Sequence, residues 1–163
     1  MGDPLEALCA VLGDEARVCG ALSGALRAER DAAIVLDADA IVASLAERRA
    51  LNDELARLAA TRRHLVRSLA RARGQTAEGV TELLPLLAPE PGRRVRQQLR
   101  GLRQAVLDAR SLGRQNALFA ASSLDGVGEM LRLLASLQPG ARYGADARVA
   151  ASGGPTNRID RRV

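Results

Sequence analysis

The sequence predicts an all-α protein: an elongated antiparallel, coiled-coil-like bundle of three long helices and one short helix, followed by a disordered C-terminal tail. Apolar residues recur every three or four positions over most of the 163 residues. The chain has one Phe, one Tyr and no Trp, so its core must consist of Leu, Val and Ala. Such a core is typical of helical bundles and not of β-sandwiches.

The helices can be placed from their caps and breakers. We expect a bundle over residues 1–137 with helices at about 4–30, 38–72, 76–87 and 91–137, and a flexible tail over residues 138–163. Asp3 and Pro4 provide a cap and a first-turn proline for the first helix. Asp37 or Asp39 can cap the second helix, and Pro85 kinks the short helix or ends it early.

The last helix has an uneven apolar stripe. Large aliphatic side chains occupy both ends of the stripe, and Ala, Gly, Asn and Ser occupy its middle. Burying one large aliphatic side chain is worth roughly 1.5–3 kcal/mol, and the small or polar ones give much less. Burial of either end of the stripe is therefore worth much more than burial of its middle, which suggests that the two ends pack against two different partners. Asn116 is the one polar residue at a position of this stripe where a large apolar side chain is expected. It either specifies the register of the bundle or contacts a partner.

Helix lengths indicate where the second partner binds. At 1.5 Å per residue the three long helices measure about 40, 50 and 70 Å, so the last helix overshoots its antiparallel neighbour by about 20 Å. The overshooting residues 124–137 contain the apolar residues Leu124, Val127, Met130, Leu131, Leu133, Leu134 and Leu137. An exposed apolar patch normally marks a partner site. Alternatively, this stretch packs against the connection at residues 34–36 or against a second copy; we expect a monomer or weak dimer when free.

The charge pattern favours internal pairing. All 24 basic residues are Arg; residues 1–47 carry nine acids and three Arg, whereas residues 48–114 carry fifteen Arg and six acids. Opposite charges on neighbouring helices pair within the molecule, each exposed pair contributing about 0–1 kcal/mol. Single-stranded nucleic acid would require aromatic stacking platforms, which the chain lacks. We therefore expect no nucleic-acid partner.

The sequence shows no group of residues with the spacing of a catalytic, metal-binding or phosphate-binding site. His64 is the only histidine, without a second metal ligand at a suitable spacing, and there is no triad or Gly-rich phosphate loop. Cys9 and Cys19 lie about 15 Å apart along one helix, too far to bridge, and are expected to be reduced thiols. We predict no enzyme activity, no catalytic, metal or cofactor-binding residues and no cofactor. Without a leader or an apolar span, the chain is expected to be soluble and cytoplasmic, without membrane insertion.

The helix order and two short segments resemble the FlgN family of flagellar type III export chaperones. The segments are residues 109–116, which end in Asn116, and the tail sequence that contains Tyr143-Gly144; the resemblance covers about residues 1–147. It implies a cytoplasmic chaperone that binds the terminal amphipathic segments of hook-associated (hook–filament junction) proteins and delivers them to the flagellar export gate. The predicted client-binding residues are Asn116, Leu124, Val127, Met130, Leu131, Leu134 and Leu137. By the same resemblance, Tyr143 docks on the gate; the alternative is an incidental linker residue.

Two other functions remain open. A self-associating coiled-coil scaffold would form a stable dimer without any client. A basic helical nucleic-acid-binding regulator would use the arginines of residues 57–73 and 93–114, and its binding would weaken steeply with salt.

Overall fold

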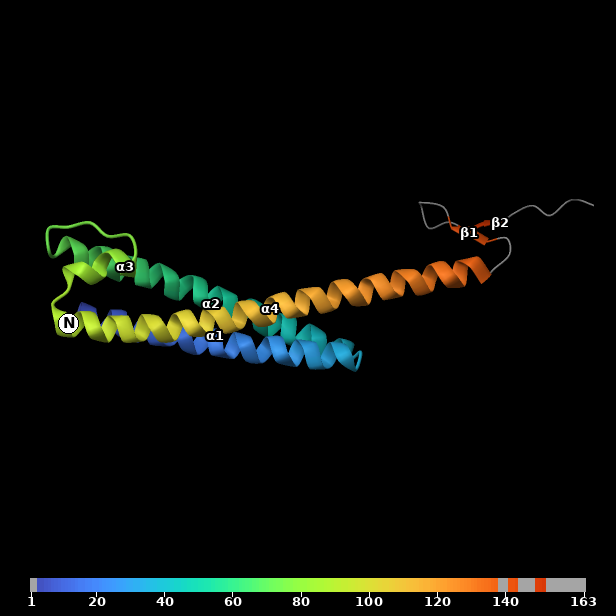
Figure 1. Ribbon diagram of the computed structural model, residues 1–163, viewed down its shortest axis with the longest axis horizontal. Coiled ribbons are helices and arrows are strands. Elements are labelled where there is room, and N and C mark those ends of the chain that lie inside the picture. The colour runs from blue at the N-terminus through green and yellow to red at the C-terminus, as the bar shows by residue number, and fades with distance from the viewer. Residues whose placement is uncertain (1–2, 138–140, 144–148, 152–163) are drawn as a thin grey trace, which may run out of the picture. The chain divides into compact units, whose positions relative to one another are not determined.

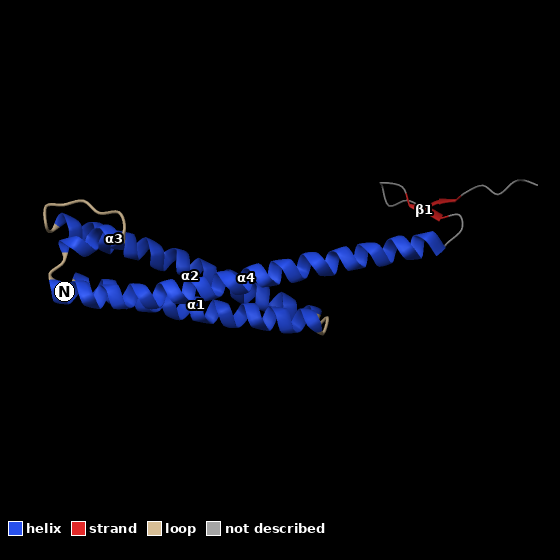
Figure 2. Cartoon of the chain, in the orientation of Figure 1, coloured by secondary structure: helices blue, strands red, loops and turns tan. Residues whose placement is uncertain are grey.

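The computed structural model describes residues 3–137, 141–143 and 149–151. It divides into two units, Met1–Ala117 and Leu118–Val163, which are described separately. The elements are α1 (Pro4–Ile34), α2 (Ala38–Arg71), α3 (Val80–Leu83), the 3-10 helix η1 (Leu84–Leu86), α4 (Pro89–Leu137), β1 (Ala141–Tyr143) and β2 (Val149–Ala151) (Figure 1). The predicted all-α class is confirmed, with three long helices packed together and one short helix (Figure 2).

Helix α1 begins where the sequence predicts and continues further than expected. The backbone N–H of Leu5 donates to the carboxylate of Asp3 over 2.9 Å, and Pro4 occupies the first turn. The predicted end near residue 30 is wrong, because the helix continues through Ile34 and stops only where Leu36 adopts a left-handed φ of 58°. The connection to α2 is therefore shorter than the one expected from the sequence.

Helix α2 is capped by Asp37, whose carboxylate accepts from the backbone N–H of Ala40 over 3.0 Å. The short helix predicted at 76–87 is smaller than expected: α3 has four residues and continues into η1, which contains Pro85. Proline lacks the N–H that an α-helix requires and clashes with the carbonyl four residues earlier, so the α-helical turn ends before it. Helix α4 begins at Pro89 instead of 91; both prolines lie in the first turn, where an N–H has no helical partner.

The core of the first unit is built from aliphatic side chains of all four helices. In Figure 1, α1, α2 and the first part of α4 run side by side, with α3 beside the end of α2. Central buried residues are Leu8 and Leu12 of α1, Val66 and Leu69 of α2, Val80 and Leu83 of α3, and Val95 and Leu102 of α4. No aromatic side chain takes part in this cluster, as the composition predicts.

Ion pairs join the acidic helix α1 to arginines of its neighbours, in agreement with the charge pattern. Arg48 contacts Glu29 at 2.7 Å, and Arg62 contacts Glu15 at 2.5 Å. Glu6 accepts two hydrogen bonds from Arg94 of α4, at 2.6 and 2.9 Å. Glu15 is buried, and burial raises the pKa of its carboxyl while Arg62 acts in the opposite direction.

The second unit contains one element in the tail that the composition does not predict. Strands β1 and β2 pair antiparallel, with Ala141 opposite Ala151, Arg142 opposite Ala150 and Tyr143 opposite Val149. The rest of the predicted flexible tail over residues 138–163 lies outside the described residues.

Candidate functional site

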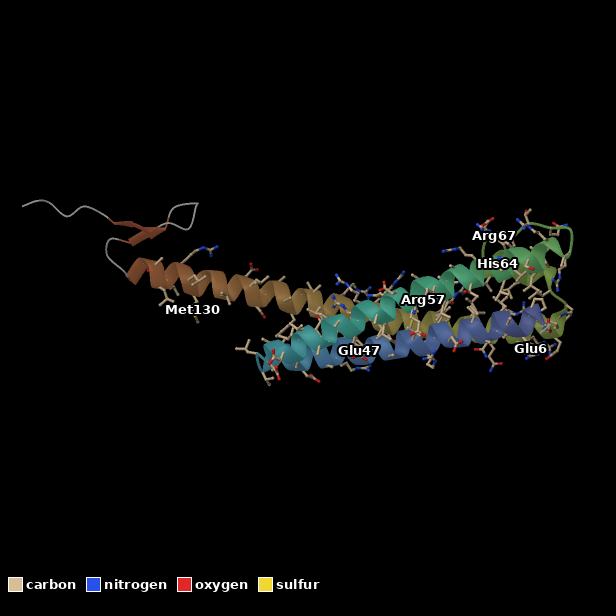
Figure 3. All side chains as sticks on the ribbon, turned by 180° about the vertical axis from the view of Figure 1, so that it is seen from behind. Glu6, Glu47, Arg57, His64, Arg67 and Met130 are labelled. Atoms are coloured by element: carbon tan, nitrogen blue, oxygen red, sulfur yellow. The ribbon has the colours of Figure 1, made fainter. Side chains whose placement is uncertain are left out.

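The most prominent surface feature of the second unit is an apolar face on its part of α4. The side chains of Leu124, Val127, Met130, Leu131 and Leu134 are 54–72% exposed. At 3.6 residues per turn, all five lie within roughly 60° of Val127 around the helix. Met130 is labelled in Figure 3, where its side chain points away from the α4 ribbon. We refer to these five residues as the α4 apolar face.

The opposite side of the same helix segment is polar. Asp125, Glu129, Arg132 and Ser136 lie within roughly 40° of the point opposite Val127. A helix surface that is apolar on one side and charged on the other normally covers a hydrophobic partner with its apolar side. The segment is thus amphipathic, and its apolar side chains are exposed.

The α4 apolar face continues the seam that builds the core of the first unit. Val95, Leu102, Ala109 and Asn116 are buried at successive seven-residue intervals along α4. Steps of seven drift by only about 20° around a helix, so these residues share a side with Val127. One continuous stripe of α4 is therefore buried along its first part and exposed along its last.

Asn116 marks the end of the buried part of the stripe. Its side chain is 8% exposed, and its Nδ2 donates to the carbonyl of Leu26 in α1 over 2.7 Å. Its Oδ1 is buried and has no hydrogen-bond partner among the described residues. The helix-to-helix contact is of the kind expected from a residue that fixes bundle register. The assignment of Asn116 to client binding stays a prediction.

The remaining predicted site residues are described only in part. Leu137 is the last residue of α4, and Tyr143 is the last residue of β1, but the side chains of both lie outside the described part of the structure. Leu133 is also exposed and lies beside the α4 apolar face, not on it. Sequence reasoning did not single out Leu107 and Leu118, two further exposed leucines of α4 that lie on its opposite side.

The groups that could support chemistry lie apart from one another. His64 is exposed on α2 beside Arg67 (Figure 3). Cys9 and Cys19 are free, and burial raises the pKa of both thiols, which keeps them protonated. Among the described residues, no group of three His, Cys, Asp or Glu side chains could hold a metal ion. No helix in the described ranges combines the length and apolar character that crossing a membrane requires.

Comparison with known families decides the identity of this helical chain. The family described as "FlgN protein" matches it over residues 1–151. The chain belongs to the FlgN family. No curated protein and no solved structure matches it. Membership of the FlgN family implies a flagellar export chaperone role and binding to hook-associated proteins. FlgN chaperones are cytoplasmic and non-enzymatic.

Proposed function

We propose that this FlgN chaperone binds terminal amphipathic segments of a hook-associated protein on the α4 apolar face. The observation that carries the proposal is the exposure of Leu124, Val127, Met130, Leu131 and Leu134 on one side of one helix. The predicted surface also includes Leu137, next in the same stripe. An amphipathic client helix would pack its apolar side on this surface, as helices do in groove and coiled-coil recognition.

The expected strength of this contact suits a complex that must later release its client. The five side chains are between about half and three-quarters exposed. Covering the exposed part of one is worth about 1–2 kcal/mol, so covering all five is worth about 5–10 kcal/mol before costs are subtracted. Ordering a disordered segment costs about 2–5 kcal/mol or more. The net affinity is moderate, and dissociation at the export machinery needs no large input of energy.

Delivery is the second half of the proposal. We propose that Tyr143 docks on a component of the flagellar export gate, as the family resemblance implies. Tyr143 is the only tyrosine of the chain and follows α4 by only a few residues. A solitary aromatic side chain can act as an anchor residue in a protein interface. Client binding and gate docking would then use different parts of the second unit.

Mixing the chain with a purified hook-associated protein tests client binding. We expect a 1:1 complex by size-exclusion chromatography with light scattering. We also expect more helix by circular dichroism than the sum of the two free proteins, because the client segment orders on binding. A matched control uses the same client without its terminal segments, which should neither bind nor add helix. A stable homodimer that persists in the presence of client would instead favour the self-associating scaffold.

A further inference from the structure

A second exposed apolar patch lies in the first unit, at the turn between α1 and α2. Ile34, Val35 and Leu36, three consecutive residues, are 59–85% exposed, and Leu36 has the highest value. We refer to these three residues as the hairpin-tip patch. None of them belongs to the α4 apolar face, and the proposed client binding does not use them.

The backbone at Leu36 is unusual for a residue of this type. The N–H of Leu36 donates to the carbonyl of Ala33 over 3.3 Å, and the N–H of Asp37 donates to the carbonyl of Ala32 over 3.0 Å. This pair of bonds is a Schellman motif, in which the residue at the position of Leu36 adopts a left-handed conformation and is usually glycine. Here leucine adopts it, with φ 58°.

The other end of α2 supplies an internal comparison. The N–H of Gly74 donates to the carbonyl of Arg71 over 2.9 Å, and the N–H of Gln75 donates to that of Ala70 over 3.1 Å. The same motif closes α2 with glycine, at φ 67°. Leucine in this conformation is strained relative to glycine. Because the Leu36 side chain is 85% exposed, burial within the described structure does not offset that strain. Residues other than glycine that are held in the left-handed conformation cluster at functional sites.

The charge around the hairpin-tip patch indicates which kind of partner surface would complement it. Residues 31–47 contain four acids, Asp31, Asp37, Asp39 and Glu47, and no basic residue, although the whole chain carries a net charge of +5. All four are exposed, and among the ion pairs between described residues none includes them. Asp37 caps α2 through one oxygen. This end of the hairpin is apolar and acidic, so its complement is apolar and basic.

We propose that the hairpin-tip patch is a second docking surface, which takes a basic amphipathic helix of a partner protein. The partner's apolar side would cover Leu36 and its neighbours, and its Lys or Arg side chains would face Asp31, Asp37 and Asp39. A symmetric contact between two copies of the tip would place like charges opposite one another, so the tip is unsuited to self-pairing.

The test uses a synthetic 18-residue helix with Leu at three-four spacing and Lys elsewhere, and a matched peptide with Glu in place of Lys. We expect the Lys peptide to shift the backbone amide resonances of residues 31–45 in the full chain, and the Glu peptide to leave them unchanged. Leu36→Gly and Leu36→Asn both suit a left-handed residue and remove the apolar side chain. Each should weaken Lys-peptide binding at these residues about tenfold, as expected for losing one covered leucine. Leu36→Gly should also raise the Tm by about 2–4 °C.

Leu118→Ser is the matched control, because it removes another exposed leucine and should leave these shifts unchanged. Unchanged affinity in either Leu36 variant, equal binding of both peptides, or a Leu36-dependent homodimer would overturn the proposal. A Tm lowered in both Leu36 variants would also overturn it, since Leu36 would then be structural. The Leu36 variants and Leu118→Ser should all keep the affinity of the chain for a hook-associated protein. A negative result with the Lys peptide would therefore leave the proposed client binding on α4 unaffected.

Discussion

Replacing two leucines of the α4 apolar face should weaken client binding with little effect on folding. We consider the double variant Leu131→Ser with Leu134→Ser. Both side chains are exposed on α4 in the second unit, at 60% and 54%, so the folded chain loses few contacts when they are shortened. Ser is a poorer helix former than Leu by only a few tenths of a kcal/mol. The free energy of unfolding should therefore change by less than about 1 kcal/mol.

The expected loss of affinity follows from the exposed fractions. Full burial of a leucine side chain is worth about 1.5–3 kcal/mol. A client that covers the exposed 60% of Leu131 and 54% of Leu134 gains, from the two together, about 1.7–3.4 kcal/mol. At 1.4 kcal/mol per factor of ten, the double variant should raise the Kd by about 20- to 300-fold.

Isothermal titration of a purified hook-associated protein into each variant measures this change. The matched control is Leu107→Ser with Leu118→Ser, which removes two leucines of similar exposure, 58% and 72%, from the opposite side of α4. Its Kd should stay within about threefold of that of the unchanged chain. Equal losses in both double variants would refute the assignment of the client to one side of α4. An unchanged Kd in the first variant would refute the use of this face altogether.

Three further predictions concern single residues. Burial raises the pKa of the Glu15 carboxyl in the folded state, with Arg62 opposing, so the folded chain holds this proton more tightly than the unfolded chain does. Stability should therefore fall as the pH rises from the ordinary glutamate pKa through the raised one, and Glu15→Gln should remove this slope from a series of Tm measurements across the same pH range. Asn116→Ala removes the hydrogen bond to Leu26 and should lower the free energy of unfolding by about 0.5–1.5 kcal/mol in a denaturant titration. The client Kd of the same variant tests the predicted second role: a rise of about tenfold or more would place Asn116 on the client surface, and a Kd within about threefold would confine it to bundle register. Tyr143→Ala should leave client binding intact and reduce secretion of the hook-associated protein in a flagellated host, whereas normal secretion would contradict gate docking.

The periodicity of the sequence was sufficient to predict the fold class, because a stripe of Leu and Val at three-four spacing must be buried against other helices. The helix lengths separated the buried part of the stripe from the part that bears Met130 and Leu134, since the last helix is long enough to overshoot its neighbour by about 20 Å. The Asp3 cap was equally predictable, because its side chain bonds to the backbone two residues later.

The features that sequence reasoning missed depend on backbone conformation and on contacts distant in sequence. The end of α1 was misplaced because leucine at position 36 gives no signal of a left-handed residue, whereas Gly74 at the corresponding place after α2 does. The bond from Asn116 to Leu26 joins residues 90 positions apart, and seam position alone could not distinguish it from a partner contact. The pairing of β1 with β2 was missed because strands of three residues are too short to show a periodicity in the sequence.

Hydrogen–deuterium exchange of the chain with and without a purified hook-associated protein locates the client-binding surface. We predict that bound client slows exchange in peptides from residues 118–137, where the α4 apolar face lies, and leaves most of Met1–Ala117 unchanged. Slower exchange confined to Met1–Ala117, with residues 118–137 unaffected, would show that the client binds elsewhere on the chain.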